Sequence, residues 1–237
     1  MNSFDLSILT YLNSFANFNP HLDVLITAVH QNNLVSNGFM VAAWWYCWFQ
    51  FAPTQQHRPA AQEKLMAGLA AVLGALLLAQ LIAHIPPLRV RPFLNPELHF
   101  VIPNWDGTPP PLKNWSAFPS DHAVLWFALA TTIYLVSKPI GWLAMAYAAF
   151  LSLCRVYSGY HHPTDILAGA ALGVTVVLLC NIRITKKHFA QAGLRLSERS
   201  PGLFYAVIFL LTYEIANTFN EARAIAALCL HAVKIFA

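Results

Sequence analysis

Residues 65–85 read LMAGLAAVLGALLLAQLIAHI, an apolar stretch without Asp, Glu, Lys or Arg that decides the fold class. A helix needs about 20 residues to cross about 30 Å of hydrocarbon, so this stretch is long enough to span a membrane. Five further apolar segments lie at 34–52, 120–136, 140–156, 166–182 and 203–219. We therefore expect an all-α, polytopic membrane protein built as a bundle of six transmembrane helices.

The composition agrees with a membrane protein. Hydrophobic residues make up 57% of the chain and charged residues only 10%, whereas soluble domains are roughly one-quarter charged. The apolar segments are also much longer than the alternating strands of an outer-membrane barrel. The absence of a linker, an internal repeat or a low-complexity tail predicts one integral-membrane domain over residues 1–237.

The first thirty residues differ from a signal peptide. They contain no Lys or Arg, so the positively charged start of a signal peptide is missing. Phe4, Ile8, Leu12 and Phe15 recur at helical intervals, which predicts an amphipathic, interfacial N-terminal helix. At the other end, residues 222–236 predict a short re-entrant or interfacial helix.

Three short polar motifs stand at the ends of the apolar segments. They are Arg91-Pro92, then Pro119-Ser120-Asp121-His122, then Arg155 with His161 and Asp165. Phosphoryl transfer requires guanidinium groups for the phosphoryl oxygens, one imidazole to attack, another to protonate the leaving oxygen, and a carboxylate to orient the attacker. Each motif alone has an ordinary structural interpretation, such as a helix cap. The order of the spans, however, places all three motifs on one side of the membrane, which predicts a single pocket.

The basic residues predict the orientation, because Lys and Arg gather on the cytoplasmic side. Alternate connections carry eight basic residues on one side and six on the other. Setting aside Arg89, Arg91 and Arg155, which adjoin the candidate site, leaves eight against three. We therefore expect the N-terminus and the site to face outward and the 183–199 loop to face the cytoplasm. The net charge of +4 then reflects topology, and no nucleic-acid partner is expected.

The spacing of these motifs resembles the type 2 phosphatidic acid phosphatase superfamily, whose pattern is Lys-x6-Arg-Pro, Pro-Ser-Gly-His and Ser-Arg-x5-His-x3-Asp. This chain has His84-x6-Arg91-Pro92, Pro119-Ser120-Asp121-His122 and Cys154-Arg155-x5-His161-x3-Asp165. The spacing agrees throughout, and three residue identities differ. The Asp form of the second motif resembles bacitracin-resistance-type undecaprenyl diphosphatases.

The resemblance implies a catalytic role for three residues. His161 would attack phosphorus and form a phosphohistidine, and Asp165 would orient it by accepting a hydrogen bond from the other ring nitrogen. His122 would protonate the leaving oxygen and then activate the water that hydrolyses the intermediate.

The resemblance also implies the phosphate-binding residues. Arg91 and Arg155 would clamp the phosphoryl oxygens with their donor forks. Ser120 would add a hydroxyl donor at the start of a helix, where free N–H groups and the helix dipole favour an anion. With these cations in place, no metal and no cofactor are expected.

The departures from the family pattern leave alternatives open. Where the family has Lys, this chain has His84, so either a protonated His84 or the nearby Arg89 would supply the missing cation. Asp121 replaces a Gly, and its carboxylate would either aim away from phosphate, serve the helix N-terminus or raise the pKa of His122. Cys154 replaces a Ser, which would remove one weak contact to phosphate or to a residue that binds it.

Two further features carry alternatives. Glu214, within the last apolar segment, would line the substrate path, pair with Arg155 or stay neutral in the core. The proline-rich segment 86–118 would form either an interfacial lid or a spacer, the lid using the aromatic residues Trp105, Trp115 and Phe118.

We therefore expect metal-independent hydrolysis of a lipid phosphate or diphosphate at the outer face of a bacterial cytoplasmic (inner) membrane. Undecaprenyl diphosphate is the preferred substrate, and no obligate protein partner is inferred. The alternatives are a phosphatidic acid or phosphatidylglycerol phosphate phosphatase, a lipid phosphotransferase, and a phosphate-binding membrane protein without catalysis.

Overall fold

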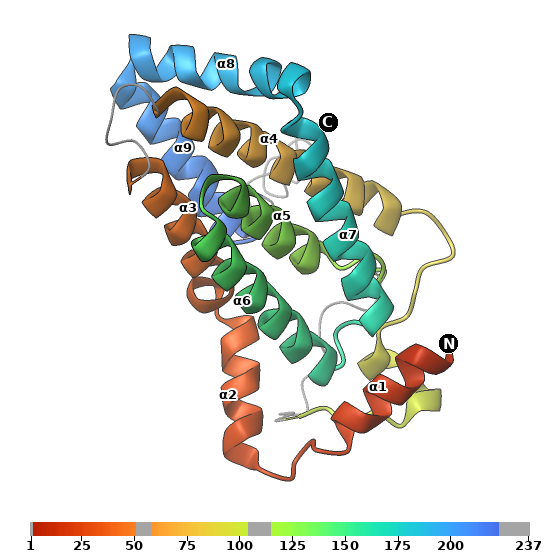
Figure 1. The fold of residues 1–237 in the computed structure, drawn as a ribbon. Coiled ribbons are helices and arrows are strands. Elements are labelled where there is room, and N and C mark those ends of the chain that lie inside the picture. The colour runs from red at the N-terminus through yellow and green to blue at the C-terminus, as the bar shows by residue number, and fades with distance from the viewer. Residues whose placement is uncertain (1, 51–57, 104–114, 223–237) are drawn as a thin grey trace, which may run out of the picture.

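The computed structural model describes residues 2–50, 58–103 and 115–222, and the regular structure within them is helical throughout (Figure 1). A helix lies at each of the six predicted apolar ranges. In chain order the elements are α1 (Ser3–Asn13), α2 (Pro20–Gln31), the π-helix η1 (Leu34–Gly38), α3 (Phe39–Gln50), α4 (Arg58–Ala83), the 3-10 helices η2 (Pro92–Leu94) and η3 (Pro96–Leu98), α5 (Asp121–Val136), α6 (Lys138–Tyr157), α7 (Pro163–Cys180), α8 (Arg183–Arg199) and α9 (Pro201–Ala216).

Three helices within the described residues are long and apolar enough to cross a membrane: residues Ala60–Ala83 of α4, together with α6 and α7. The apolar helices α5 and α9 are shorter. Large apolar side chains such as Leu81, Trp142, Leu143 and Leu210 are exposed on the outside, as expected of a surface that faces lipid. The all-helical membrane fold is therefore confirmed, while the number of six spans stays a prediction.

Helix α5 is the centre of the bundle and packs against α4, α6 and α7 (Figure 1). The approach of α7 depends on two glycines. A Cβ atom at Gly169 would lie 2.5 Å from the Ser120 carbonyl oxygen, and one at Gly173 would lie 2.5 Å from that of Val124. Because real Cβ atoms essentially never make such contacts, these glycines allow α7 to pack directly against α5.

Aromatic side chains join α3 to α9 beside this centre. Trp48 stacks on Trp44 and on Phe204, with ring centroids 5.5 and 5.4 Å apart. The buried Trp126 of α5 donates its indole N–H to Asn37 Oδ1 of η1 at 2.7 Å. These contacts hold α3 against α9 and η1 against α5. The elements α2, η1 and α3 run on from one another (Figure 1).

Two segments differ from a simple reading of the sequence. The N-terminal helix α1 turns Asp5 and Leu9 inward and leaves Phe4 and Tyr11 exposed, because Asp5 finds hydrogen-bond partners in Thr164 and Arg89. The basic connection predicted as a loop is the helix α8, which packs across α4. The predicted helix at 222–236 lies outside the described residues except for its first residue.

Replacing Gly173 with Ala is expected to push α7 away from α5 and lower the free energy of unfolding by about 1–3 kcal/mol, the usual cost of overpacking. Thermal unfolding of the purified protein in detergent measures the change. Gly74→Ala on α4 is the matched control, because no described atom lies within 4 Å of the added Cβ and Ala is the better helix former. Equal stability of Gly173→Ala and wild type would contradict the close contact.

Candidate active site

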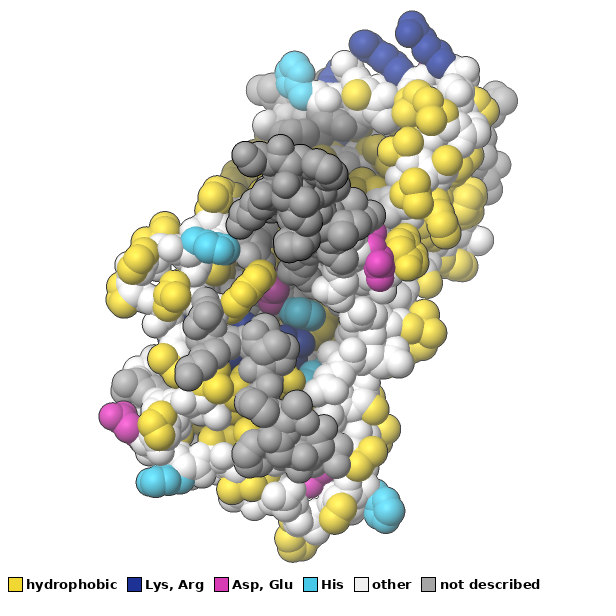
Figure 2. Space-filling view, turned by 180° about the vertical axis from the view of Figure 1, so that it is seen from behind, with side chains coloured by type: hydrophobic (Ala, Val, Ile, Leu, Met, Phe, Trp, Pro, Cys, Tyr) yellow, Lys and Arg dark blue, Asp and Glu magenta, His cyan; other side chains and the backbone are white. Residues whose placement is uncertain are grey.

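The predicted site residues come together where several elements end. Asp121 and His122 begin α5, Arg155 lies in the last turn of α6, and His161 lies in the turn between α6 and α7. Arg91 directly precedes η2. In the space-filling view, acidic, basic and histidine side chains meet on the floor of a hollow (Figure 2). The convergence predicted from the alternating spans is therefore seen in the tertiary structure.

A tight turn presents the imidazole of His161. Gly159 in this turn has φ +72°, a left-handed conformation that favours glycine, and a Cβ there would lie 2.5 Å from the Phe100 ring. The His161 ring is 1% exposed, and its Nδ1 donates to the carbonyl oxygen of Ala117 at 2.9 Å. The carbonyl can only accept, so Nδ1 carries the proton and Nε2 keeps its lone pair. Nε2 lies 3.4 Å from Arg91 Nη1.

Asp165 is fully buried beside this ring but serves other groups. Its Oδ2 accepts from the backbone N–H of His162 at 2.7 Å and from His162 Nδ1 at 3.1 Å, which caps the start of α7. Its Oδ1 pairs with Arg89. Oδ2 is 3.9 Å from His161 Nδ1, too far for a hydrogen bond. The Nδ1 proton of His161 is therefore donated to the Ala117 carbonyl, a backbone contact that no sequence motif predicts.

Asp121 lies directly against His122. Its Oδ1 accepts from both the backbone N–H and Nδ1 of His122, each at 2.8 Å. The carboxylate thus fixes the ring so that Nε2 is the nitrogen left for proton transfer. The ring edge also meets Trp126, with centroids 5.5 Å apart. These contacts give Asp121 a role outside the three alternatives named from the sequence, the orientation of His122.

Two buried guanidinium groups complete the site. Arg91 Nη1 donates to the carbonyl oxygen of Tyr160 at 2.9 Å, and Arg155 lies 5.0 Å from the centre of the Tyr160 ring. The Nε atoms of both arginines are buried without a hydrogen-bond partner among the described residues. Within the same residues neither arginine forms a salt bridge. Since a buried, uncompensated charge costs several kcal/mol, this pair is suited to hold an anion.

The electrostatic surroundings keep His161 neutral. Burial lowers the pKa of its imidazole well below the usual range, and the charges of Arg155 and Arg91 lower it further, against the opposing effect of Asp121. A neutral ring at physiological pH retains the lone pair that a nucleophile requires. The same two cations that would bind phosphate therefore also keep the attacking nitrogen unprotonated.

The other predicted phosphate ligands have different contacts. Ser120 accepts from the Ala123 N–H at 3.4 Å and caps α5. The two Nη atoms of Arg89 bind Asp5, Asp165 and Thr164. His84 sits at the exposed end of α4 and donates Nδ1 to the Gln80 carbonyl at 2.7 Å. Phosphate binding by Ser120, Arg89 and His84 stays a prediction.

Glu214 and the proline-rich segment 86–118 are the two features whose roles the sequence left open. Glu214 Oε2 accepts from the Ala222 N–H at 3.1 Å, and within the described residues no salt bridge joins it to Arg155. Of the predicted lid, residues 104–114, including Trp105, lie outside the described residues. Trp115 and Phe118 are 43% and 37% exposed.

Among the described residues, no group of three or more His, Cys, Asp and Glu side chains is arranged to hold a metal ion.

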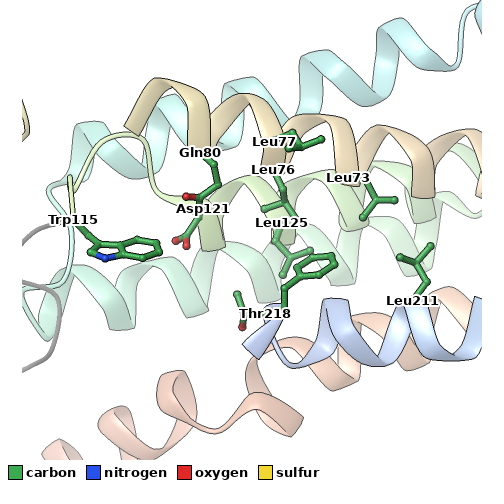
Figure 3. Close-up of a pocket in the computed structure, with 10 residues that line it drawn as sticks. Leu73, Leu76, Leu77, Gln80, Trp115, Asp121, Leu125, Leu211 and Thr218 are labelled. Atoms are coloured by element: carbon green, nitrogen blue, oxygen red, sulfur yellow. The ribbon is translucent and has the colours of Figure 1, made fainter. Parts of the chain in front are cut away.

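An apolar cavity of about 530 Å³ opens beside Asp121 (Figure 3). Gln80, Trp115 and Asp121 lie at one end of it, Leu76 and Leu125 line its middle, and Leu73 and Leu211 lie at the other end. Its walls come from α4, α5 and α9. A polar site thus continues into a long apolar groove, the shape expected of a ligand with a charged head and a hydrocarbon chain.

Residues 64–189 match the profile of the PAP2 superfamily, which covers more than half of the chain and all three motifs. The chain belongs to this superfamily. The PAP2 region therefore runs from α4 into α8 and contains every motif residue, while α1, α2 and α3 precede it.

Three curated relatives resemble the chain. The bacitracin transport permease protein BcrC of Bacillus licheniformis is 38% identical over 84 residues, which are 35% of this chain and 41% of the relative. The undecaprenyl-diphosphatase BcrC of Bacillus subtilis is 22% identical over 172 residues, 73% of this chain and 80% of the relative. An undecaprenyl-diphosphatase of Sulfolobus acidocaldarius is 35% identical over 92 residues, 38% of this chain and 41% of the relative. The first and third matches thus span less than half of the relative's length. No solved structure matches this PAP2 protein with significance.

Inorganic phosphate is expected to raise the thermal unfolding temperature of the protein in detergent, because an anion compensates the buried guanidiniums. At about 100 times its Kd, phosphate would add about 2.7 kcal/mol of stability. Arg91→Gln and Arg155→Gln should each reduce this shift strongly. Lys186→Gln is the matched control, since Lys186 pairs with Glu63 at 3.4 Å outside the site. An equal shift in all four proteins would show that phosphate does not bind at the arginines.

Proposed function

We propose that the protein hydrolyses a membrane lipid phosphate or diphosphate through a phosphohistidine on His161. The proposed substrate is undecaprenyl diphosphate, and the products are undecaprenyl phosphate and inorganic phosphate. The observation that carries this proposal is the unprotonated Nε2 of His161 beside the buried guanidinium of Arg91. Membership of the PAP2 superfamily supports the reaction class, and the names of two relatives support the substrate.

The first step is phosphoryl transfer to the enzyme. Nε2 of His161 attacks the terminal phosphorus, and a P–N bond forms as the P–O bond to the lipid phosphate breaks. His122, as an imidazolium, gives its Nε2 proton to the leaving oxygen. Arg91 and Arg155 hold the charge that spreads over the phosphoryl oxygens. Undecaprenyl phosphate leaves after this step.

The second step is hydrolysis of the intermediate. His122, now neutral, takes a proton from a water molecule that attacks the same phosphorus. The P–N bond breaks, phosphate is released, and both histidines return to their starting state. Throughout, the Ala117 carbonyl holds the Nδ1 proton of His161, and the Asp165 carboxylate at 3.9 Å stabilises the positive charge that develops on the ring.

The apolar groove supports a lipid as the substrate. Its polar end lies at Asp121, whose neighbour His122 would meet the leaving oxygen. The carbon chain of the departing lipid phosphate would then continue along Leu76 and Leu125 toward Leu211. Because these side chains are apolar, the groove favours hydrocarbon over a hydrated sugar or nucleoside.

We further propose six spans, one formed by η1 with α3 and the others by α4, α5, α6, α7 and α9. The excess of basic residues in the alternate connections supports a site at the outer face of a bacterial inner membrane. The buried arginines supply the positive charge that a metal ion supplies elsewhere, which supports metal-independent hydrolysis.

The direct test is phosphate release in detergent with a chelator. Undecaprenyl diphosphate, phosphatidic acid and phosphatidylglycerol phosphate are compared for wild type and His161→Ala. We expect release that is fastest from undecaprenyl diphosphate and absent in the variant, because the P–N bond cannot form. A different preferred lipid would replace the proposed substrate. No release from any lipid by folded wild-type protein would favour a phosphotransferase or a phosphate-binding role.

Two groove variants test whether the lipid chain follows the cavity. Leu76→Trp fills the groove and should raise KM for undecaprenyl diphosphate while leaving the cleavage of isopentenyl diphosphate, a short soluble analogue, unchanged. Leu78→Trp lies on the same helix but is exposed outside the groove, and it should behave as wild type. Equal effects of both variants would mean that the hydrocarbon chain of the lipid binds outside the groove.

Asp121→Asn is expected to lower kcat about tenfold with little change in KM, because Asn keeps an acceptor for His122 but not the charge that favours its imidazolium. This loss should be smaller than that of His122→Ala, for which about 10²–10⁴-fold is typical of a general acid. Steady-state kinetics with the preferred lipid measure both. A higher kcat for Asp121→Asn would mean that the carboxylate only repels phosphate.

A further inference from the structure

The N-terminal helix α1 places a carboxylate behind the active site. Asp5 is fully buried, although α1 lies outside the region that defines the superfamily. Its Oδ1 accepts from the Thr164 N–H at 2.9 Å. Its Oδ2 accepts from the Thr164 hydroxyl at 2.7 Å and from Arg89 Nη2 at 2.6 Å. In the sequence, Asp5 can be recognised as an acid within an apolar segment. Its partners Thr164 and Arg89 are distant in the chain, so the sequence does not show the contacts.

These contacts keep Asp5 charged. Burial alone raises the pKa of its carboxyl, but the hydrogen bonds from Thr164 and the charge of Arg89 outweigh burial and lower the pKa below its usual value. Asp5 is therefore a carboxylate at neutral pH. It anchors one end of the Arg89 guanidinium while Asp165 holds the other.

Arg89 connects this anchor to both neighbours of the nucleophile. Its side chain pairs with Asp165, which lies 3.9 Å from His161 Nδ1. Its backbone carbonyl accepts from the Ala117 N–H at 2.8 Å, and the Ala117 carbonyl in turn accepts from His161 Nδ1 at 2.9 Å. The position of Arg89 therefore determines the carbonyl that fixes the tautomer and the carboxylate nearest to the ring.

We propose that Asp5 is a positioning residue that acts through Arg89 to hold the Nδ1-protonated tautomer of His161. In wild type, two carboxylates share one guanidinium, so Arg89 cannot turn toward either one alone. Without the charge of Asp5, Arg89 is drawn to Asp165, and the Ala117 carbonyl moves with the Arg89 backbone. The effect on catalysis rests on the proposed function, whereas the effect on the tautomer does not.

Another buried acid of the N-terminal region provides the matched control. Asp23 accepts from the Tyr157 hydroxyl and from the Asn17 N–H at 2.8 Å, and it therefore docks α2 on α6. No described contact joins Asp23 to Arg89 or Asp165. Asp23→Asn thus weakens N-terminal docking without touching the proposed path.

The experiment has two readouts on full-length protein in detergent. Long-range ¹⁵N–¹H spectra of histidine-labelled protein, assigned with His161→Gln, report the tautomer of His161. Kinetics with the preferred lipid report kcat and KM. We expect Asp5→Asn to mix the tautomers and to lower kcat about 10- to 100-fold, with KM little changed. This range is the one seen when an outer hydrogen-bond partner of a metal-bound histidine is removed. Asp5→Glu should restore part of kcat, and Asp23→Asn should lower only the unfolding temperature.

A double-mutant cycle tests the path through Arg89. If Asp5 acts through Arg89, Asp5→Asn should cause no further loss of kcat in an Arg89→Gln background. An unchanged tautomer in Asp5→Asn, or a loss equal to that of Asp23→Asn, would overturn the proposal and leave Asp5 as an anchor of α1. Wild-type protein without lipid hydrolysis would instead reject the proposed function, and the tautomer comparison would still decide the role of Asp5.

Discussion

The direct contact between α5 and α7 is the constraint on which the site depends. Glycines at 169 and 173 remove the side chains that would separate the two helices. The start of α5 then lies against the first turn of α7, where the Ser120 N–H donates to the Asp165 carbonyl at 3.1 Å. The acid, the nucleophile and the carboxylate come from different motifs, and this contact brings them together.

Charge is distributed unequally around that contact. The carboxylates of the site are already engaged, Asp121 with His122 and Asp165 with Arg89 and His162. Arg91 and Arg155 are buried without a carboxylate partner among the described residues. The polar network therefore leaves an excess of buried positive charge where phosphate would sit, and a bound anion would stabilise the fold while it is positioned for attack.

At the positions where the chain departs from the family pattern, the structure shows which side chains pair with one another. Asp121, which stands where a glycine is usual, gives His122 a carboxylate of its own. Arg89 lies beside the position of the missing lysine but is held between Asp5 and Asp165. The N-terminal helix thereby becomes part of the support of the site, although it precedes the region by which the superfamily is recognised.

The sequence by itself determined the helical membrane class, the ranges of the apolar helices and the identity of the motif residues, because hydrophobic length and motif spacing are local properties of the chain. It also predicted that the motifs would converge. Only the tertiary structure decided that Ala117 rather than Asp165 accepts from His161, that Asp5 holds Arg89, and that 183–199 is helical. The first two depend on backbone carbonyls and on pairs of residues far apart in sequence, and such contacts exist only once the helices have packed. The third concerns a polar segment that packs across α4 as a helix.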